Sequence, residues 1–371
     1  MVDASSTSAS KSAVRTAVWL GLFLLLAFGL RTYFGAETGF DAATDRNLFT
    51  GNDPYYHWRT VTNVVETGQS LVYDTAFNYP EGNQNPNPPL WTWTTAPVAV
   101  LLDNMGVADP VGTALNLMVG VWGALIVLPV YMIGRDLWGR QAGLWAAFFI
   151  AFSAPHIQRS VWGYADHDAI SMFFIALAFA FLVKALKALR SDRFVADWRK
   201  TATILPGKMA AVKANRNSLV YAALAGVAIT ACAATWKGYP YVMAILAVAA
   251  GLAMVVDHLR KRDGLANLLV YLTTTAVATL LPYLLVYQHA SNYLPHTVVP
   301  SLYVLFGMLV MGFLLVPTRD LPSLLVFPAV GLAAVVALVV LLLVFPAVGA
   351  DLFSGLGYFA QSKLYSTIAE A

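Results

Sequence analysis

Long apolar segments restrict the fold of this chain more than any other feature of its sequence. A helix that crosses the hydrocarbon core of a bilayer needs about 20 mostly apolar residues. Soluble domains carry roughly a quarter charged residues, whereas this chain of 371 residues has 12% charged and 58% hydrophobic residues. We therefore expect an all-α polytopic membrane protein with about nine membrane-spanning helices, one in each of these segments: 14–34, 111–134, 141–158, 168–190, 218–236, 239–257, 265–288, 297–316 and 323–346.

The positions of lysine and arginine predict the orientation of these spans, because cytoplasmic loops are rich in both residues. With the N-terminal tail, residues 1–13, in the cytoplasm, most of the 23 basic residues fall inside and most of the 20 acidic residues fall outside. We therefore expect a multi-pass protein of the cell membrane whose C-terminal end lies outside. The net charge of +3 is too small to indicate a nucleic-acid partner.

Two connections within the transmembrane domain, residues 14–346, are too long to be simple turns. The outer loop 35–110 contains FNYPEGNQNPNPPLWTW, whose prolines and asparagines disfavour both helix and strand. Long ordered loops of this kind are usually functional. The inner loop 191–217 is basic and contains no motif, so we interpret it as a segment that lies near anionic membrane lipid.

Three acidic motifs that are far apart in the sequence fall on the same predicted outer face. They are NDPYYHWR at 52–59, GYADHD at 163–168 and STIAEA at 366–371. Their carboxylates of interest are Asp53, Asp166, Asp168 and Glu370. Carboxylates are costly beside hydrocarbon unless a cation compensates their charge, and ligand sets made only of oxygen favour Mg²⁺ or Mn²⁺. The motifs therefore predict a divalent metal site on this face.

Each motif also has a purely structural explanation. Aspartate is a preferred N-cap, so Asp168 could cap the apolar helix that follows it. Asp53 followed by Pro54 is typical of a helix start, and the neighbouring aromatic residues suit the membrane interface. The TIAE stretch indicates little by itself. The order of the three motifs and their shared face favour the functional interpretation.

Five stretches, taken in order, resemble the catalytic subunits of the oligosaccharyltransferases, in particular their archaeal form. NDPYYHWR supplies the first aspartate, and YPEGNQNPNPPL is similar to the family's Tyr-Pro-x-Gly…Pro-Pro-Leu loop. HIQRSVWGYADHD resembles its Arg-Ser-x-x-Gly-x-x-Asp-x-Asp/Glu stretch, TWKGYPY its Trp-x-Gly-Tyr loop, and STIAEA its Thr-Ile-x-Glu motif. The resemblance implies a GT-C-type glycosyltransferase architecture.

The family has thirteen spans and a C-terminal soluble domain with a Trp-Trp-Asp motif that reads the acceptor sequence. By this comparison the chain holds the first nine spans, and residues 347–371 begin a large outer loop that carries TIAE. We therefore expect the C-terminal spans and the soluble domain to be absent from this sequence, and this part to be inactive alone.

The resemblance also implies roles for single residues. The metal-binding positions correspond to Asp53, Asp166 and Asp168. In addition, Asp53 would contact the acceptor amide, Arg159 would orient Asp53, and Glu370 would reach the acceptor asparagine. His167 is the middle residue of its motif, so we do not expect it to be a ligand. The cofactor implied is Mn²⁺ or Mg²⁺.

The activity implied is transfer of a glycan from a dolichyl-phosphate-type lipid carrier to the asparagine of Asn-x-Ser/Thr in a polypeptide, on the extracellular face. One alternative is a related GT-C glycosyltransferase that uses a lipid-linked sugar and a different acceptor. Another is an ion-coupled transporter, which would carry ionisable residues in mid-span. The spans here are nearly free of charge, which disfavours a transporter.

Overall fold

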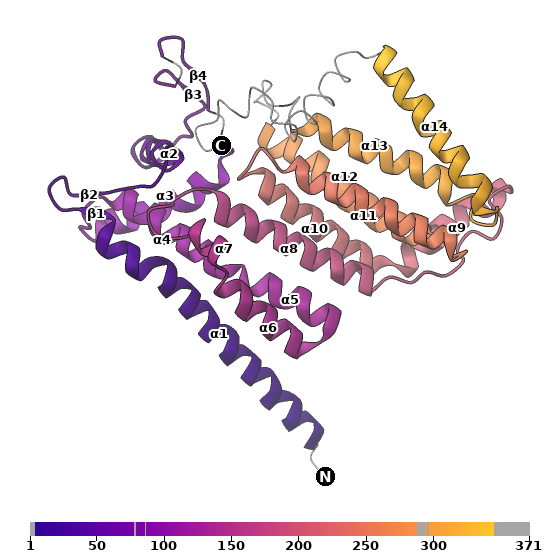
Figure 1. Ribbon diagram of the computed structural model, residues 1–371, viewed down its shortest axis with the longest axis horizontal. Coiled ribbons are helices and arrows are strands. Elements are labelled where there is room, and N and C mark those ends of the chain that lie inside the picture. The colour runs from indigo at the N-terminus through magenta and orange to yellow at the C-terminus, as the bar shows by residue number, and fades with distance from the viewer. Residues whose placement is uncertain (1–3, 78, 86, 288–293, 295–296, 345–371) are drawn as a thin grey trace.

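The computed structural model describes residues 4–77, 79–85, 87–287, 294 and 297–344. Helices dominate this part of the chain, and its few strands are two residues long (Figure 1). The prediction of an all-α architecture is therefore confirmed. The segment 347–371, with its STIAEA motif, lies outside the described residues.

The elements follow one another in a simple order. The helices are α1 (Ala4–Thr38), α2 (Asp53–Thr67), α3 (Leu90–Asn104), α4 (Pro110–Leu125), α5 (Val127–Trp138), α6 (Arg140–Ala151), α7 (Ala154–Gln158), α8 (Asp168–Lys187), α9 (Thr201–Ala214), α10 (Arg216–Ala233), α11 (Pro240–Leu259), α12 (Leu265–Pro282), the π-helix η1 (Tyr283–Tyr287), α13 (Val298–Leu315) and α14 (Ser323–Val344). The strands form two antiparallel pairs, β1 (Phe40–Asp41) with β2 (Arg46–Asn47), and β3 (Tyr73–Asp74) with β4 (Asn83–Gln84).

Seven helical segments within the described residues are long and apolar enough to cross a membrane. They are Ser12–Tyr33, Pro110–Trp138, Asp168–Lys187, Arg216–Ala233, Pro240–Leu259, Leu265–Tyr287 and Val298–Leu315. Two of the nine predicted spans are not among these seven segments. The segment 323–346 forms one apolar helix, α14, whose 22 residues are enough for a span. The segment 141–158 is not one helix, because α6 ends at Ala151.

The early end of α6 has a local cause. Helix continuation would require the residue four positions after Ala151 to donate its N–H to the Ala151 carbonyl, but that residue is Pro155, which has none. α6 packs closely on α5, since a Cβ on Gly134 would lie only 2.9 Å from the Cα of Gly143. The chain then returns through residues 152–167, which include α7 and which we call the α6–α8 connection.

The centre of the bundle is built from helices with small residues at their contacts. α8 packs against α5 and α10, α10 packs against α12, and α12 packs against α13. A Cβ on Gly226 would lie 2.6 Å from the Cβ of Val277, so α10 and α12 approach closely at that glycine. α1 packs against α4 and α6 at the edge of the bundle. The core thus holds the first residues of α8 in a fixed position.

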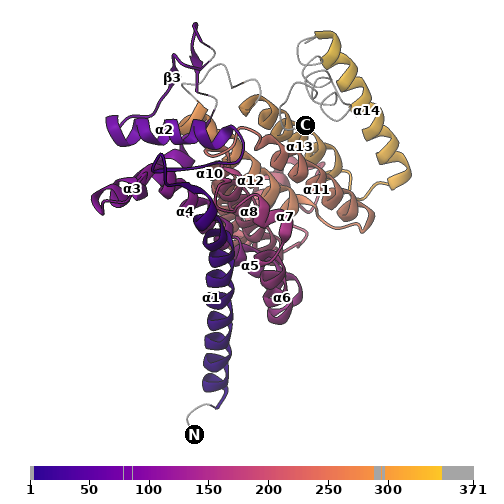
Figure 2. The same cartoon turned by 60° about the vertical axis from the view of Figure 1, so that its left-hand side comes forward.

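One end of the bundle carries α2, α3 and both strand pairs, whereas α9 lies at the other end (Figure 1). Figure 2 shows α2 lying crosswise to α1 over this end. Leu90 donates its backbone N–H to the carbonyl of Ala234 at 2.8 Å, which joins α3 to the end of α10. The expectation of irregular structure throughout FNYPEGNQNPNPPLWTW is wrong in two places, because Asn83–Gln84 form β4 and LWTW begins α3.

Candidate active site

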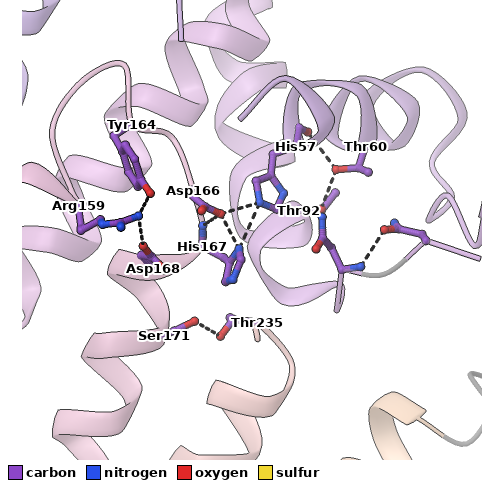
Figure 3. A network of polar contacts seen from close by, with 12 residues as sticks. His57, Thr60, Thr92, Arg159, Tyr164, Asp166, His167, Asp168, Ser171 and Thr235 are labelled. Atoms are coloured by element: carbon purple, nitrogen blue, oxygen red, sulfur yellow. Dashed lines mark hydrogen bonds and ion pairs between the residues drawn. The ribbon is translucent and has the colours of Figure 1, made fainter. Parts of the chain in front are cut away.

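A buried carboxyl group, that of Asp166, forms the centre of a polar cluster at the α2 end of the bundle (Figure 3). Asp166 is only 6% exposed. Its Oδ1 lies 2.9 Å from Nε2 of His57 and 2.5 Å from Nδ1 of His167, and it accepts a 2.6 Å hydrogen bond from the backbone N–H of His167. The NDPYYHWR and GYADHD motifs therefore meet in space, as a shared face requires.

The sequence of α2 explains why His57 points into the cluster. The buried residues of this helix are Pro54, His57, Thr60, Val61 and Val64, which share one face at helical spacing. This face rests on α3, where the Thr60 hydroxyl lies 3.3 Å from that of Thr92 and the His57 ring meets the edge of Trp91. A histidine at this position therefore turns inward, while the neighbouring Arg59 is exposed and Trp58 is half-buried.

Two carboxylates fix α2 in place. Asp74 accepts two hydrogen bonds from Arg59, at 2.7 and 2.8 Å, and is 1% exposed, so it ties the β3–β4 hairpin to α2. Asp109 precedes α4 and accepts from the N–H of Gly112, from the Trp58 indole and from the backbone and side chain of Asn47. These contacts join α2 to both neighbouring segments, so His57 has a rigid support.

The protonation of the cluster follows from its contacts. Burial acts to raise the pKa of the Asp166 carboxyl, but hydrogen bonds from His167 and His57 outweigh burial and hold this pKa below its ordinary value. Burial acts to lower the pKa of His167, yet the hydrogen bond to Asp166 raises it overall. Asp166 is therefore a carboxylate near neutral pH, with two imidazoles as neighbours.

Asp168 is the first residue of α8 and faces Arg159 rather than the histidines. Its Oδ2 lies 3.6 Å from Nη1 of Arg159, which also hydrogen-bonds the Tyr164 hydroxyl (Figure 3). Cζ of Arg159 lies 5.0 Å from the centre of the Tyr164 ring. The N-cap residue of α8 is His167, whose side chain makes no capping hydrogen bond. The structural alternative, in which Asp168 is the N-cap, is therefore wrong.

Asp53 lies exposed in the first turn of α2, where its negative charge affects the pKa values of two nearby side chains. It helps to raise the pKa of His167, and it opposes the lowering of the pKa of Lys237 that burial causes. Its predicted contact with Arg159 stays a prediction, since the ion pair described for Arg159 is with Asp168. Glu370 lies outside the described residues.

The donor atoms of the cluster fit a divalent metal. Among the described residues, His57, Asp166 and His167 each offer a ligand atom, and these atoms all lie within 4.8 Å of one another. Nδ1 of His57 is buried and has no hydrogen-bond partner in this part of the chain. Imidazole nitrogen with carboxylate oxygen suits Mn²⁺ or Zn²⁺ better than Mg²⁺, which prefers oxygen alone. The predicted set of Asp53, Asp166 and Asp168 stays a prediction.

His57 is the site residue that sequence reasoning missed. A signal was present, because His57 follows Asp53 by four residues and therefore lies one helical turn away on the same face. The middle position of His167 in its motif predicts that it is not a metal ligand. In space, its ring turns toward Asp166 and His57 (Figure 3).

One known protein family matches nearly the whole chain. The model of the oligosaccharyl transferase STT3 family, N-terminal part, matches residues 22–365. The chain belongs to the STT3 family. The match includes α2 and the start of α8, which meet at Asp166. Membership agrees with the helical membrane architecture and with the resemblance carried by the sequence motifs.

Individual relatives agree with the family. Over 220 residues, the chain is 29% identical to the dolichyl-monophosphooligosaccharide–protein glycotransferase AglB of Haloferax volcanii, which covers 58% of this chain and 20% of that protein. The chain thus spans about a fifth of the length of this relative.

Solved structures show the same fold. The archaeal oligosaccharyltransferase AglB from Archaeoglobus fulgidus, in complex with an inhibitory peptide and a dolichol-phosphate, matches with a TM-score of 0.73 at 20% identity, over 96% of this chain and 40% of that one. A crystal structure of an Archaeoglobus fulgidus oligosaccharyltransferase in complex with Zn and sulfate matches with a TM-score of 0.63 at 19% identity, over 92% of this chain and 43% of that one.

Proposed function

We propose that the protein transfers a glycan from a dolichyl-phosphate-type lipid carrier to the asparagine of Asn-x-Ser/Thr in a polypeptide, on the extracellular face of the cell membrane. The observation that carries the proposal is the buried Asp166 carboxylate, at which the first-loop helix α2 meets the start of α8. Membership of the STT3 family and the activities for which its relatives are named support these substrates.

The chemistry must overcome the low nucleophilicity of an amide nitrogen, whose lone pair is delocalised into the carbonyl. Carboxylates that accept the N–H bonds of the acceptor amide can twist or polarise it, and a charged acceptor makes such hydrogen bonds strong. By resemblance, Asp53 and Glu370 have this role. The exposed position of Asp53 at the start of α2 leaves it accessible to a polypeptide that arrives from outside.

The residues around Asp166 would hold the divalent cation. The geometry groups Asp166 with His57 and His167 as possible metal ligands. The family resemblance groups Asp166 with Asp53 and Asp168, so Asp166 belongs to both ligand sets. A bound Mn²⁺ or Mg²⁺ supplies positive charge that stabilises the phosphate leaving the lipid carrier. Within the chain itself, the α2 contacts fix His57, and Arg159 fixes Asp168.

The position of the cluster at one end of the helical bundle, where the proposed spans would leave the membrane, suits both proposed substrates. A lipid carrier is held by the bilayer beside the spanning helices, and a polypeptide arrives from the aqueous side. The structure of the Archaeoglobus relative contains an inhibitory peptide and a dolichol-phosphate, which supports the same pair of partners here.

The direct test uses the protein expressed from its complete gene, a lipid-linked oligosaccharide from the same cells, and two fluorescent peptides. One peptide carries Asn-Val-Thr and the other Gln-Val-Thr. We expect a glycopeptide product only from the first peptide, and none without the lipid-linked donor. Transfer to an acceptor without asparagine, with no product from Asn-Val-Thr, would instead support a related GT-C glycosyltransferase and contradict the proposal.

A further inference from the structure

A buried arginine on the first helix has no role in the site described above. Arg31 lies in the membrane-spanning part of α1 and is 0% exposed. No carboxylate among the described residues forms an ion pair with it. A buried cation without a counter-ion is costly, so its hydrogen bonds must compensate for the lost hydration.

The guanidinium of Arg31 is held mainly by the α6–α8 connection and by the end of α6. Its Nε donates to the hydroxyl of Ser160 at 2.8 Å, and its Nη2 lies 2.9 Å from Nδ1 of His156. Its Nη1 donates to the carbonyl of Ala151 at 3.2 Å and to that of Ala27, on its own helix, at 2.8 Å. Three of the four acceptors therefore belong to the chain that leads to Asp166.

The contact with Ala151 explains how the cation is tolerated. Ala151 ends α6, and Pro155 cannot donate to its carbonyl, so this carbonyl would be left without a partner. Carbonyls at a helix C-terminus also carry partial negative charge. Arg31 therefore satisfies the C-terminus of α6, and that C-terminus offsets part of its charge.

The imidazole of His156 must be neutral for this arrangement. Burial, together with the nearby charge of Arg31, lowers the pKa of His156 to about 4. Nδ1 then serves as an acceptor for the guanidinium. The pair is thus stable throughout the neutral pH range, and it does not act as a switch there.

Helix α4 closes the pocket that holds Arg31. A Cβ on Gly123 would lie 2.7 Å from Nε of Arg31 and 2.6 Å from Cβ of Ser160, so only glycine allows this approach. The backbone adds a further bond, because the N–H of Trp162 donates to the Arg31 carbonyl at 2.7 Å. The connection is therefore clamped between α1 and α4.

The clamped residues lead directly to the site. Next along the chain, Gly163 donates its N–H to the Asn116 side chain at 2.7 Å and accepts from the N–H of Thr50 at 2.8 Å. Asp166 follows three residues later, and its backbone N–H bonds the carbonyl of Tyr164 at 3.0 Å. Residues 159–167 are not helical themselves, so their position depends on these contacts with other elements.

We propose that Arg31 is a positioning residue that holds the α6–α8 connection and thereby places the Asp166 carboxylate against His57. The clamp itself is argued from geometry alone, whereas its effect on catalysis rests on the proposed function. Arg31 is fully buried, and its side chain is held by contacts with other residues of the chain. It acts through Ser160, His156 and the end of α6.

The test compares Arg31→Gln, Arg31→Lys and Arg15→Gln in the protein expressed from its complete gene. Arg15 is an exposed arginine on the same helix, and Arg15→Gln removes the same charge without touching the clamp. Hydrogen exchange followed by mass spectrometry measures the backbone of residues 157–168 and, as a reference for global stability, that of α10.

For Arg31→Gln we expect exchange about tenfold faster in 157–168, including the amides of Asp166 and His167, and unchanged exchange in α10. We expect kcat for glycopeptide formation to fall between about tenfold and a hundredfold, since small displacements of reacting groups have effects of this size. The KM for the peptide should stay within about twofold. Arg31→Lys should give intermediate values, because one ammonium group cannot reach all the acceptors. Arg15→Gln should match the wild type in both assays.

A pair of substitutions at His156 tests the clamp if Arg31→Gln does not fold. Asparagine can place an acceptor near the position of Nδ1, whereas alanine cannot. We expect faster exchange in 157–168 for His156→Ala and nearly normal exchange for His156→Asn. Equal effects of the two substitutions would overturn the assigned contact.

The outcomes are separable. Unchanged exchange in 157–168, or equally faster exchange in α10, would overturn the clamp, because Arg31 would then have no local role or only a global one. Faster exchange in 157–168 together with an unchanged kcat in Arg31→Gln would show that the clamp does not affect catalysis. A wild-type protein without any transfer activity would contradict the proposed function, and the exchange data would still decide whether Arg31 positions Asp166.

Discussion

Nε2 of His57 lies 2.9 Å from Oδ1 of Asp166, so two residues 109 positions apart in the chain share one buried contact. Because of this contact, the crosswise helix α2 and the start of α8 cannot shift independently. The buried face of α2, through His57, is thereby as much a part of the candidate site as the aspartates of the GYADHD motif.

His57 should contribute to metal binding. Replacing it by alanine removes one of three donor atoms and the support of the Asp166 carboxylate, so we expect the dissociation constant for Mn²⁺ to rise about tenfold or more. Electron paramagnetic resonance of unbound Mn²⁺ measures this constant. Glu66→Gln, on the exposed side of the same helix, is the matched control and should leave it unchanged. Equal Mn²⁺ affinity in His57→Ala and wild type would show that His57 has no part in the metal site.

The Asp74–Arg59 pair should stabilise the β3–β4 hairpin against α2. The hydrogen bonds from Arg59 hold the pKa of Asp74 below its ordinary value of 3.8. A carboxylate with a lowered folded-state pKa contributes stability that is complete above the unfolded-state pKa and is lost as the pH falls through the folded-state pKa. Protection of residues 68–77 from hydrogen exchange, corrected for intrinsic rates, should therefore be constant from about pH 8 to pH 5 and decline below about pH 3.8.

Asp74→Asn should lower that protection by about 2 kcal/mol at neutral pH, since it removes a charged acceptor from a buried position. Asp41→Asn is the control, because Asp41 also accepts hydrogen bonds within a turn but is less buried than Asp74 and pairs with no arginine among the described residues. Similar losses in the two variants would mean that the Arg59 pair adds nothing beyond ordinary turn hydrogen bonds.

Arg159 should act together with Asp168. The two side chains lie 3.6 Å apart, so Arg159→Lys and Asp168→Asn should have less than multiplicative effects on kcat/KM when combined. The corresponding cycle with Asp53→Asn tests the role that the family resemblance implies for Arg159. If the losses multiply fully in the Asp168 cycle, the ion pair has no functional part.

Much of the fold could be predicted from apolar patterning, because the spanning helices are long and nearly free of charge. The pairing of α2 with the GYADHD motif could also be predicted, since alternation of loops across a membrane places both on one side. The break at Ala151 could not be predicted from hydropathy, which stays high through residues 144–152. The single backbone donor missing at Pro155 decides it.

The details of the site depended on packing that the sequence does not display. His57 turns inward because Thr60 and Val64 on the same face rest on α3, and no local pattern names that partner helix. In the sequence, Arg31 is a single charge in the apolar segment 14–34, and no local pattern indicates its partners. Only the fold brings His156 and Ser160 to it, because α1 and α7 are more than a hundred residues apart.

The most direct measurement of the central claim is the Mn²⁺ dependence of glycopeptide formation, after exhaustive removal of metal, for wild type and Asp166→Asn. We expect no product from the wild type in excess chelator, and full recovery on addition of Mn²⁺. Asp166→Asn should need about tenfold to a hundredfold more Mn²⁺ for half of its maximal rate, because a neutral amide is a poorer ligand for a divalent cation. Full wild-type activity in excess chelator, or identical Mn²⁺ curves for the two proteins, would contradict a metal-dependent transfer centred on Asp166.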